Sequence, residues 1–257
     1  MEIFTGSMAI IRLFIVVLSL TMAIATDLPS NWKVCSRSLP AQQFSKCLDA
    51  AVTDAVTSLA GGLKSFRILP IEPLAVDSVT IGGSQGSVTL KQEYKNIKLY
   101  GLTNIQIYNH HLDLDNGCLL TSDSLNPQVD FVADYKIDGK VLLLPVRGFG
   151  KSNITMYGLK SRNELSCQKY EKNGETYLRI KKYAVKFNPA RINLKFDNLF
   201  DGDKTLGAQL NSFINENSEL LFKELQAPYE ETFSQVFTQL SNEVFNRVPL
   251  NKIFPPN

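Results

Sequence analysis

The sequence has few of the residues on which catalysis or nucleic-acid binding usually depends. Histidine occurs only twice in 257 residues, as the adjacent pair His110 and His111, and the formal net charge is only +2. The densest cationic spot, Lys181-Lys182, is typical of a solvated strand face and too short to suggest nucleic-acid binding. After the N-terminal segment the sequence contains no second apolar run of about 18 residues. We therefore expect no nucleic-acid partner and no stable membrane insertion.

The first 25 residues have the features of a secretory signal peptide. A lead with one arginine, Arg12, precedes the apolar run Leu13–Leu20, and Ala23-Ile24-Ala25 is a small-x-small cleavage site. The mature chain should begin near Thr26. We expect it to be secreted, extracellular and folded as one domain over residues 26–257.

All four cysteines lie in the expected mature chain, at Cys35, Cys47, Cys118 and Cys167. An even number of cysteines in a secreted protein predicts two disulfides. Of the three possible pairings, order along the chain favours Cys35–Cys47 and Cys118–Cys167. The spacing fits a zinc site poorly, and we expect no metal or cofactor. The only glycosylation sequon, Asn153-Ile154-Thr155, predicts a surface position for Asn153 if the site is used.

Hydrophobic periodicity divides the chain into a helix, a sheet and a second helical segment. Residues 41–60 carry apolar side chains three or four positions apart, and Gly61-Gly62 ends the predicted helix. From about residue 66 to residue 196 the period is two, which predicts long antiparallel strands with one buried and one solvated face. Asn188-Pro189 separates the last two strands. Three glycines are predicted bends or bulges: Gly101, Gly139 and Gly158.

The C-terminal segment returns to helical spacing. Asp203 is the predicted N-cap of an apolar stripe from Leu206 to Val244, and Pro249 disfavours helix at Val248, which precedes it. About 40 helical residues would extend for ~60 Å, so Pro228 is expected to kink or split the helix. A sheet hides its apolar face only when another layer covers it, and a long helix wrapped by a strongly curved sheet achieves this. The prediction is an α+β fold with room left along its axis.

Three segments of the chain resemble the insect takeout and juvenile-hormone-binding protein family. Residues 47–81 resemble its first helix and following turn, residues 132–150 its central strand pair, and residues 194–255 its C-terminal segment. The resemblance extends over nearly the whole mature chain and is most specific in the C-terminal segment. It implies membership of the tubular lipid-binding proteins, in which a curved antiparallel β-sheet wraps a long C-terminal helix and encloses an elongated apolar tunnel.

The resemblance also implies a function. Members of this family carry small hydrophobic molecules such as juvenile hormone, fatty-acyl chains or other terpenoids, without catalysis, and circadian output, feeding and hormone transport are themes of the family. Cys35 and Cys47 match the N-terminal cysteine pair of the family in order, and Cys118 and Cys167 are similar to the second pair of the hormone carriers. We expect a monomer whose partner is a small hydrophobic ligand.

The segment 131–144 combines two patterns. Residues 131–140 alternate between apolar and polar, which is typical of a strand with one buried face. Val141-Leu142-Leu143-Leu144 is apolar throughout. With the family fold in mind, we expect the C-terminal helix or a sheet edge to cover the second face of this run. Pro145 and Gly148 would then turn the chain into the next strand.

Strand parity and helical phase select the candidate walls of the tunnel. Aromatic residues at helical spacing usually belong to the hydrophobic core. A ligand-binding function requires only some residues of the C-terminal stripe to face an unfilled volume. The candidate ligand-binding residues are Leu99, Ile105, Ile107, Phe131, Tyr135, Leu143, Val185, Phe187, Phe213, Leu221, Val236 and Phe237.

Two short motifs suggest other chemistry. Residues 82–86 satisfy the G-x-S-x-G pattern around Ser84, but a strand-like segment follows and both histidines lie too close downstream for a hydrolase triad. We interpret this stretch as a glycine-rich hairpin turn. His111, Asp113 and Asp115 share one side of a strand and are possible metal ligands, or simply its solvated side, which we favour.

Two further functions remain as alternatives. A secreted interaction or signalling module would have its interior filled by side chains and a large apolar patch on its surface. A membrane-disrupting protein should have a basic tip, against which the low net charge argues. No catalytic residue is assigned.

Overall fold

The computed structural model describes residues 27–82 and 88–256. The expected signal peptide, residues 1–25, and Ser84 lie outside the described residues. The helices are α1 (Ala41–Ser58), α2 (Lys204–Glu216), α3 (Ser218–Phe245) and α4 (Leu250–Ile253), with single 3-10 turns at Leu59–Gly61, Lys64–Phe66 and Phe200–Gly202. The strands are β1 (Leu74–Ile81), β2 (Val88–Tyr100), β3 (Gln106–Asp113), β4 (Leu119–Val141), β5 (Leu144–Lys172), β6 (Glu175–Asn188) and β7 (Arg191–Phe196).

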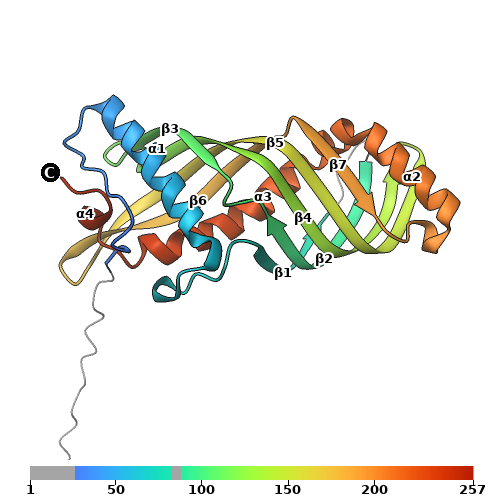
Figure 1. The fold of residues 1–257 in the computed structure, drawn as a ribbon, viewed down its shortest axis with the longest axis horizontal. Helices are drawn as coiled ribbons and strands as arrows, with labels where there is room; N and C mark the ends of the chain where they lie inside the picture. Colours follow the sequence, from blue (N-terminus) through green and yellow to red (C-terminus); the bar gives the residue numbers. More distant parts are fainter. Residues whose placement is uncertain (1–26, 83–87, 257) are drawn as a thin grey trace, which may run out of the picture.

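The strands form one antiparallel sheet built on a very long hairpin. β4 has 23 residues and β5 has 29. β2 pairs with the second half of β4 and carries β1, while β7 pairs with the first half of β5. β3 pairs with the first half of β4, and β6 with the second half of β5. Among the described strands the sheet stays open, and it curves around α3, which runs lengthwise along it (Figure 1). The predicted α+β wrap is confirmed.

The hairpin is interrupted at Pro127 and Gly158, which stand opposite each other in the ladder. Gly158 adopts a φ of 55°, the left-handed region that favours glycine. Ser124 is buried before the interruption and Phe131 after it, although residues an odd number of positions apart face opposite sides of a regular strand. The interruption therefore lets both halves of the hairpin turn side chains into the interior. The bend predicted at Gly158 is confirmed.

The apolar run Val141–Leu144 is the turn of this hairpin. β4 ends at Val141, β5 begins at Leu144, and Leu142 takes a left-handed φ of 54°. Val141 is fully buried, but Leu143 is 93% exposed. The expectation that another layer covers this run is wrong, as is the expectation that Pro145 and Gly148 reverse the chain. Two-residue turns with positive φ usually carry glycine or asparagine, so this sequence gives no turn signal.

The C-terminal helical segment is divided at Asn217 and not at Pro228. Asp203 caps α2 as predicted, because its Oδ1 accepts hydrogen bonds from the N–H groups of Thr205 and Leu206 at 3.0 and 2.9 Å. Asn217 leaves the helical conformation, and its side-chain amide donates to Phe213 O at 2.8 Å. α3 continues through Pro228. The expected split at Pro228 is therefore wrong: the segment divides at Asn217, whose φ of −109° and ψ of 16° depart from helical values.

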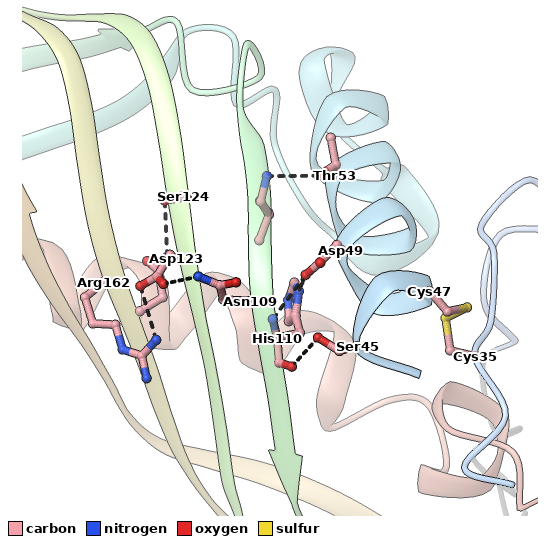
Figure 2. Close-up of polar contacts among 12 residues, drawn as sticks. Cys35, Ser45, Cys47, Asp49, Thr53, Asn109, His110, Asp123, Ser124 and Arg162 are labelled. Atoms are coloured by element: carbon pink, nitrogen blue, oxygen red, sulfur yellow. Dashed lines mark hydrogen bonds and ion pairs between the residues drawn. A yellow bond between two sulfur atoms is a disulfide. The ribbon is translucent and has the colours of Figure 1, made fainter. Parts of the chain in front are cut away.

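Helix α1 covers the free edge of β3 through side chains spaced four residues apart. Ser45 Oγ donates to His110 O at 2.6 Å, Asp49 Oδ1 accepts from His110 N at 3.1 Å, and Thr53 Oγ1 accepts from Ile107 N at 3.2 Å. Figure 2 shows these three side chains directed from α1 at the strand. They satisfy edge backbone groups that would otherwise need a neighbouring strand.

Helices α2 and α3 cover the opposite edge of the sheet in the same way. Asn211 and Asn215 in α2 each pair with both the N–H and the C=O of a β7 residue, Phe196 and Leu194 respectively, over 2.7–3.0 Å. In α3, Asn242 pairs with both groups of Ile180 in β6 at 2.9 and 2.8 Å. Three more α3 side chains bond to the β6 backbone: Gln226, Glu230 and Thr238.

The described residues form two hydrophobic clusters in the interior. The larger lies between the sheet and helices α2 and α3. The smaller lies beneath α1 and α4 and contains both disulfides, Cys35–Cys47 and Cys118–Cys167, in the predicted pairing. Within the part of the chain that the structure describes, none of the helices is long and apolar enough to cross a membrane.

Candidate ligand-binding cavity

The larger cluster surrounds an elongated, partly open cavity between the sheet and helices α2 and α3. About 100 Å³ of it is open to the centre of a water molecule. Its α3 wall runs from Ser218 to Phe237, a distance of about 28 Å at 1.5 Å per residue. The lining residues are Leu90, Gln92, Leu99, Leu102, Val129, Phe131, Ile137, Val141, Val146, Ile154, Met156, Leu159, Phe187, Ile192, Leu194, Phe196, Ile214, Ser218, Leu221, Phe222, Leu225, Tyr229, Phe233 and Phe237.

The lining is apolar apart from three groups. These are the amide of Gln92, the hydroxyl of Ser218 and the hydroxyl of Tyr229, and none of the described lining residues carries a charge. Apolar walls with a few polar groups are typical of sites for small hydrophobic molecules, which bind by burying their surface. A charged molecule would be bound there without a counter-ion, which is unfavourable.

An aromatic cluster lines the cavity along the second half of α3. Phe233 lies 6.3 Å from the ring centroids of both Phe131 and Phe187 and 6.0 Å from that of Phe237. Phe237 in turn packs on Tyr183, with centroids 5.4 Å apart.

Next to the aromatic cluster the interior contains a chain of polar contacts. The hydroxyl of Tyr183 donates to Asn163 Oδ1 at 2.9 Å, and the Asn163 amide donates to Ser124 Oγ at 3.2 Å. Burial raises the pKa of Tyr183 well above its ordinary value, so the hydroxyl stays protonated as a donor. The apolar cavity is therefore confined to one half of the molecule.

A polar cluster lies within the apolar half. Gln92 Oε1 lies 2.8 Å from the hydroxyl of Tyr94 and 3.0 Å from that of Tyr229, and the two hydroxyl oxygens are 2.9 Å apart. Burial raises the pKa of both tyrosines, which keeps their hydroxyls neutral. These three residues join β2 to α3 across the cavity wall.

The structure brings five of the twelve candidate wall residues to the cavity: Leu99, Phe131, Phe187, Leu221 and Phe237. Four others belong to the same hydrophobic cluster without lining the cavity: Tyr135, Val185, Phe213 and Val236. Tyr135 directs its hydroxyl at Asp197 O, 2.5 Å away. Its role is to join the sheet to the segment after β7.

Three candidates do not lie at the cavity. Ile107 is in β3 under α1, Ile105 precedes that strand, and Leu143 is at the exposed hairpin turn. Their assignment to the wall is wrong. The prediction for Ile105 and Ile107 assumes that the alternation of inward and outward residues continues from Leu99. It does not continue, because β2 ends at Tyr100 and β3 belongs to the other half of the sheet.

Sequence reasoning missed several lining residues that carry a readable signal. Gln92 shares the parity of Leu90 and Tyr94 and is therefore an inward position of β2. On α3, Leu225, Tyr229 and Phe233 continue the spacing of four between the two candidates Leu221 and Phe237. The lining residues of β5 and β7, such as Ile154 and Leu194, had no such signal because their facing depends on the interruption at Gly158 and on which half of β5 receives β7.

The possible metal ligands do not converge. Asp113 Oδ1 accepts the N–H groups of Asp115 and Asn116, which lowers the Asp113 pKa, and Asp115 pairs with Lys169 at 3.1 Å. Across residues 27–82 and 88–256, no group of three or more His, Cys, Asp or Glu side chains is arranged to hold a metal ion. His111 is exposed.

Asn153 lies within β5, between β4 and β7, and is half-buried. The hydroxyl of Thr155, the third residue of the sequon, lies 3.4 Å from Asn153 Oδ1 and donates to Asp130 at 2.5 Å. Glycosylation of Asn153 stays a prediction.

Comparisons with known proteins agree on one family. The family model described as haemolymph juvenile hormone binding protein (JHBP) matches residues 13–255. The circadian clock-controlled protein daywake of Drosophila melanogaster is 25% identical over 235 residues, and that of Drosophila yakuba 24% identical over 233, each with 88% of both chains covered. The crystal structure of Epiphyas postvittana Takeout 1 superimposes with a TM-score of 0.75 at 23% identity, over 82% of this chain and 96% of that one, which supports the fold.

Proposed function

The chain belongs to the haemolymph juvenile hormone binding protein family, and from this premise we propose that it is a secreted, non-enzymatic carrier of a small hydrophobic molecule. The family comprises binding proteins for hydrophobic ligands. The ligand class proposed for this chain is a juvenile hormone, a fatty-acyl compound or another terpenoid. It would lie in the cavity along α3, in a monomeric protein.

The observation that carries this proposal is a partly open cavity whose walls are almost wholly apolar and uncharged. Burial of apolar surface contributes ~25 cal/mol per Å², so a ligand that buries ~300 Å² gains roughly 7 kcal/mol before the costs of association. The signalling-module alternative requires an interior filled by side chains, and the internal space argues against it.

Secretion is supported by the cysteines. Every cysteine of the chain is paired in a disulfide, a state that persists in oxidising compartments such as the extracellular space. The predicted signal peptide is consistent with this location. A carrier without catalytic activity agrees with a family of binding proteins. Since no role is proposed for Ser84, Ser84→Ala should leave ligand binding unchanged.

The test is to fill the cavity and measure binding. Leu225 lines the cavity and is 7% exposed, so Leu225→Trp should occupy ligand space and weaken binding of a fluorescent naphthylamine probe by roughly tenfold. Leu206→Trp is the matched control, because Leu206 is 46% exposed on α2 and does not line the cavity. If the wild-type protein binds neither this probe nor any member of a broad lipid panel, the carrier function is wrong.

A further inference from the structure

The turn of the long β4–β5 hairpin exposes three large apolar side chains in a row. Leu142, Leu143 and Leu144 are 42%, 93% and 44% exposed, whereas the other exposed large apolar residues in the described part of the chain do not form such a run. Two-residue hairpin turns usually carry glycine, asparagine or aspartate, and a run of exposed apolar residues is unfavourable in water unless it has a function. The turn therefore has the character of a contact surface.

This surface lies beside the cavity. Val141 and Val146, one on each strand of the hairpin, are fully buried and line the cavity. Val141 is two positions from Leu143 and Val146 is two positions from Leu144, which corresponds to about 7 Å along a strand. A partner that covers the leucines therefore lies close to the end of the cavity wall.

The charges nearest to the turn are positive on both strands. Residues 141–146 carry no charge, and the first charged residues beyond them are Lys140 on β4 and Arg147 on β5, both exposed. Arg147 also pairs on the surface with Asp201 at 3.1 Å, just before α2, at the opposite end of the molecule from α1 (Figure 1). An apolar tip between cations is complementary to a phospholipid surface, which offers acyl chains to the leucines and phosphates to the cations.

The size of the surface argues against a protein partner, including a second copy of the chain. The exposed fractions of the three leucines together amount to less than two fully exposed residues. A stable protein interface buries roughly 800 Å² on each partner, from roughly 20 to 30 residues. A bilayer needs no such matching surface, and each leucine buried in it favours binding by roughly 10- to 100-fold.

We propose that the turn at residues 142–144 docks the protein on phospholipid membranes, with its leucines among the acyl chains and with Lys140 and Arg147 at the headgroups. Docking is shallow and reversible, and it brings the end of the cavity to the phase in which a hydrophobic ligand dissolves. The docking is independent of the proposed carrier function, whereas its use in loading or release of a ligand rests on that function.

The experiment measures flotation of the protein with vesicles of phosphatidylcholine that contain about one fifth phosphatidylserine. The wild-type protein should float with the vesicles. The double variant Leu142→Gly with Leu143→Ser should lower the partition coefficient at least roughly tenfold, because two apolar side chains are removed. Glycine adopts the positive φ at position 142 without strain, so the variant should fold.

Leu69→Ser is the matched control, since Leu69 is 74% exposed, lies between α1 and β1 and does not line the cavity. It should float as the wild-type protein does. Leu143→Trp gives a second measurement: its fluorescence emission should shift to shorter wavelengths when vesicles are added. The wild-type protein, whose only tryptophan is Trp32, provides the background.

Three results would overturn the docking proposal: no flotation of the wild-type protein, equal flotation of the folded double variant, or an equal loss of flotation in Leu69→Ser. If the double variant does not fold, an emission of Leu143→Trp that vesicles leave unchanged overturns it. A wild-type dimer in sedimentation velocity without vesicles, abolished by the double variant, would assign the turn to self-association instead.

Titration with a fluorescent naphthylamine probe in the absence of vesicles separates the two proposals. The double variant should bind the probe as the wild-type protein does. Loss of flotation with intact probe binding leaves the carrier function standing, whereas flotation of a protein that binds no probe and no lipid overturns the carrier function alone.

Discussion

His110 is the residue through which mild acid is expected to lower the stability of the fold. Its Nδ1 lies 2.7 Å from Asp49 Oδ1, and the side chain is 10% exposed (Figure 2). Burial lowers the His110 pKa below 6.5, although the Asp49 carboxylate acts in the opposite direction. The folded state therefore binds this proton less readily than the unfolded chain does.

The sign of the pH dependence follows from linkage. When the folded-state pKa of a histidine is lowered, its contribution to stability is complete above the unfolded value of about 6.5 and is lost as the pH falls below it. We predict that the free energy of unfolding falls between about pH 7.5 and pH 5.5, and that His110→Gln makes this dependence shallower. Urea unfolding across this range measures it.

His111→Gln is the control for this measurement, because His111 is the exposed neighbour in the same strand. It should keep the wild-type slope. A slope that is unchanged in His110→Gln, or altered equally in both variants, would show that His110 does not carry the effect.

Among secondary-structure elements, the helices support the sheet by replacing missing strands. Asn215 in α2 illustrates this, because its amide satisfies both the N–H and the C=O of Leu194 at the free edge of β7, at 2.8 and 2.7 Å. Removing a side chain that pairs two part-buried backbone groups leaves both without their partner.

We predict that Asn215→Leu lowers the free energy of unfolding by about 2 kcal/mol, since each unpaired group costs ~1 kcal/mol or more. Gln209→Leu, at an exposed position of the same helix, should change stability by less than about 0.5 kcal/mol. Chemical denaturation of both variants provides the comparison. Equal stabilities would mean that the amide does not support the edge.

The elements were predictable where one local pattern decides them. Period-four apolar spacing gave the helices, period-two alternation gave the strands, and Asn188-Pro189 separates β6 from β7 as predicted. The turn at Leu142-Leu143 was not predictable, because Leu142 takes a left-handed φ that is unusual for leucine, and the break at Asn217 was not predictable because neither proline nor glycine marks it. The polar residues at spacing four, such as Asn211 and Asn215, are visible in the sequence, but their partners are set by the tertiary fold.

The residues of the candidate site were predictable only within uninterrupted strands and helices. Residues on uninterrupted elements, Phe131 in β4 and Leu221 in α3, were assigned to the cavity correctly by parity and helical phase. Residues beyond a change of strand, such as Ile107, were not. Gln92 was missed because the prediction took only apolar residues at the inward positions of a strand as wall residues.

In the whole molecule, the two disulfides and the cavity lie in different hydrophobic clusters. Figure 1 shows α1 and α4, which cover the disulfide cluster, at the opposite end of the molecule from α2. The bond Cys118–Cys167 joins residues 49 positions apart. A cross-link of that length restricts the unfolded chain and contributes about 4 kcal/mol in the chain-entropy description.

We predict that the double variant Cys118→Ala with Cys167→Ala loses up to about 4 kcal/mol of stability but keeps its affinity for a hydrophobic probe within about twofold, because no described lining residue is a cysteine. Urea unfolding and probe titration measure the two quantities on one sample. A large loss of affinity in protein that is still folded would mean that the disulfide end shapes the cavity.

The central claim is that the interior has room that the side chains leave for a ligand. Native mass spectrometry of the protein secreted from insect cells tests it most directly. The account predicts one bound molecule of lipid mass that is released on denaturation and is reduced or absent in Leu225→Trp but retained in Leu206→Trp. Identical native and denatured masses for the wild-type protein, with no uptake from an added lipid panel, would contradict it.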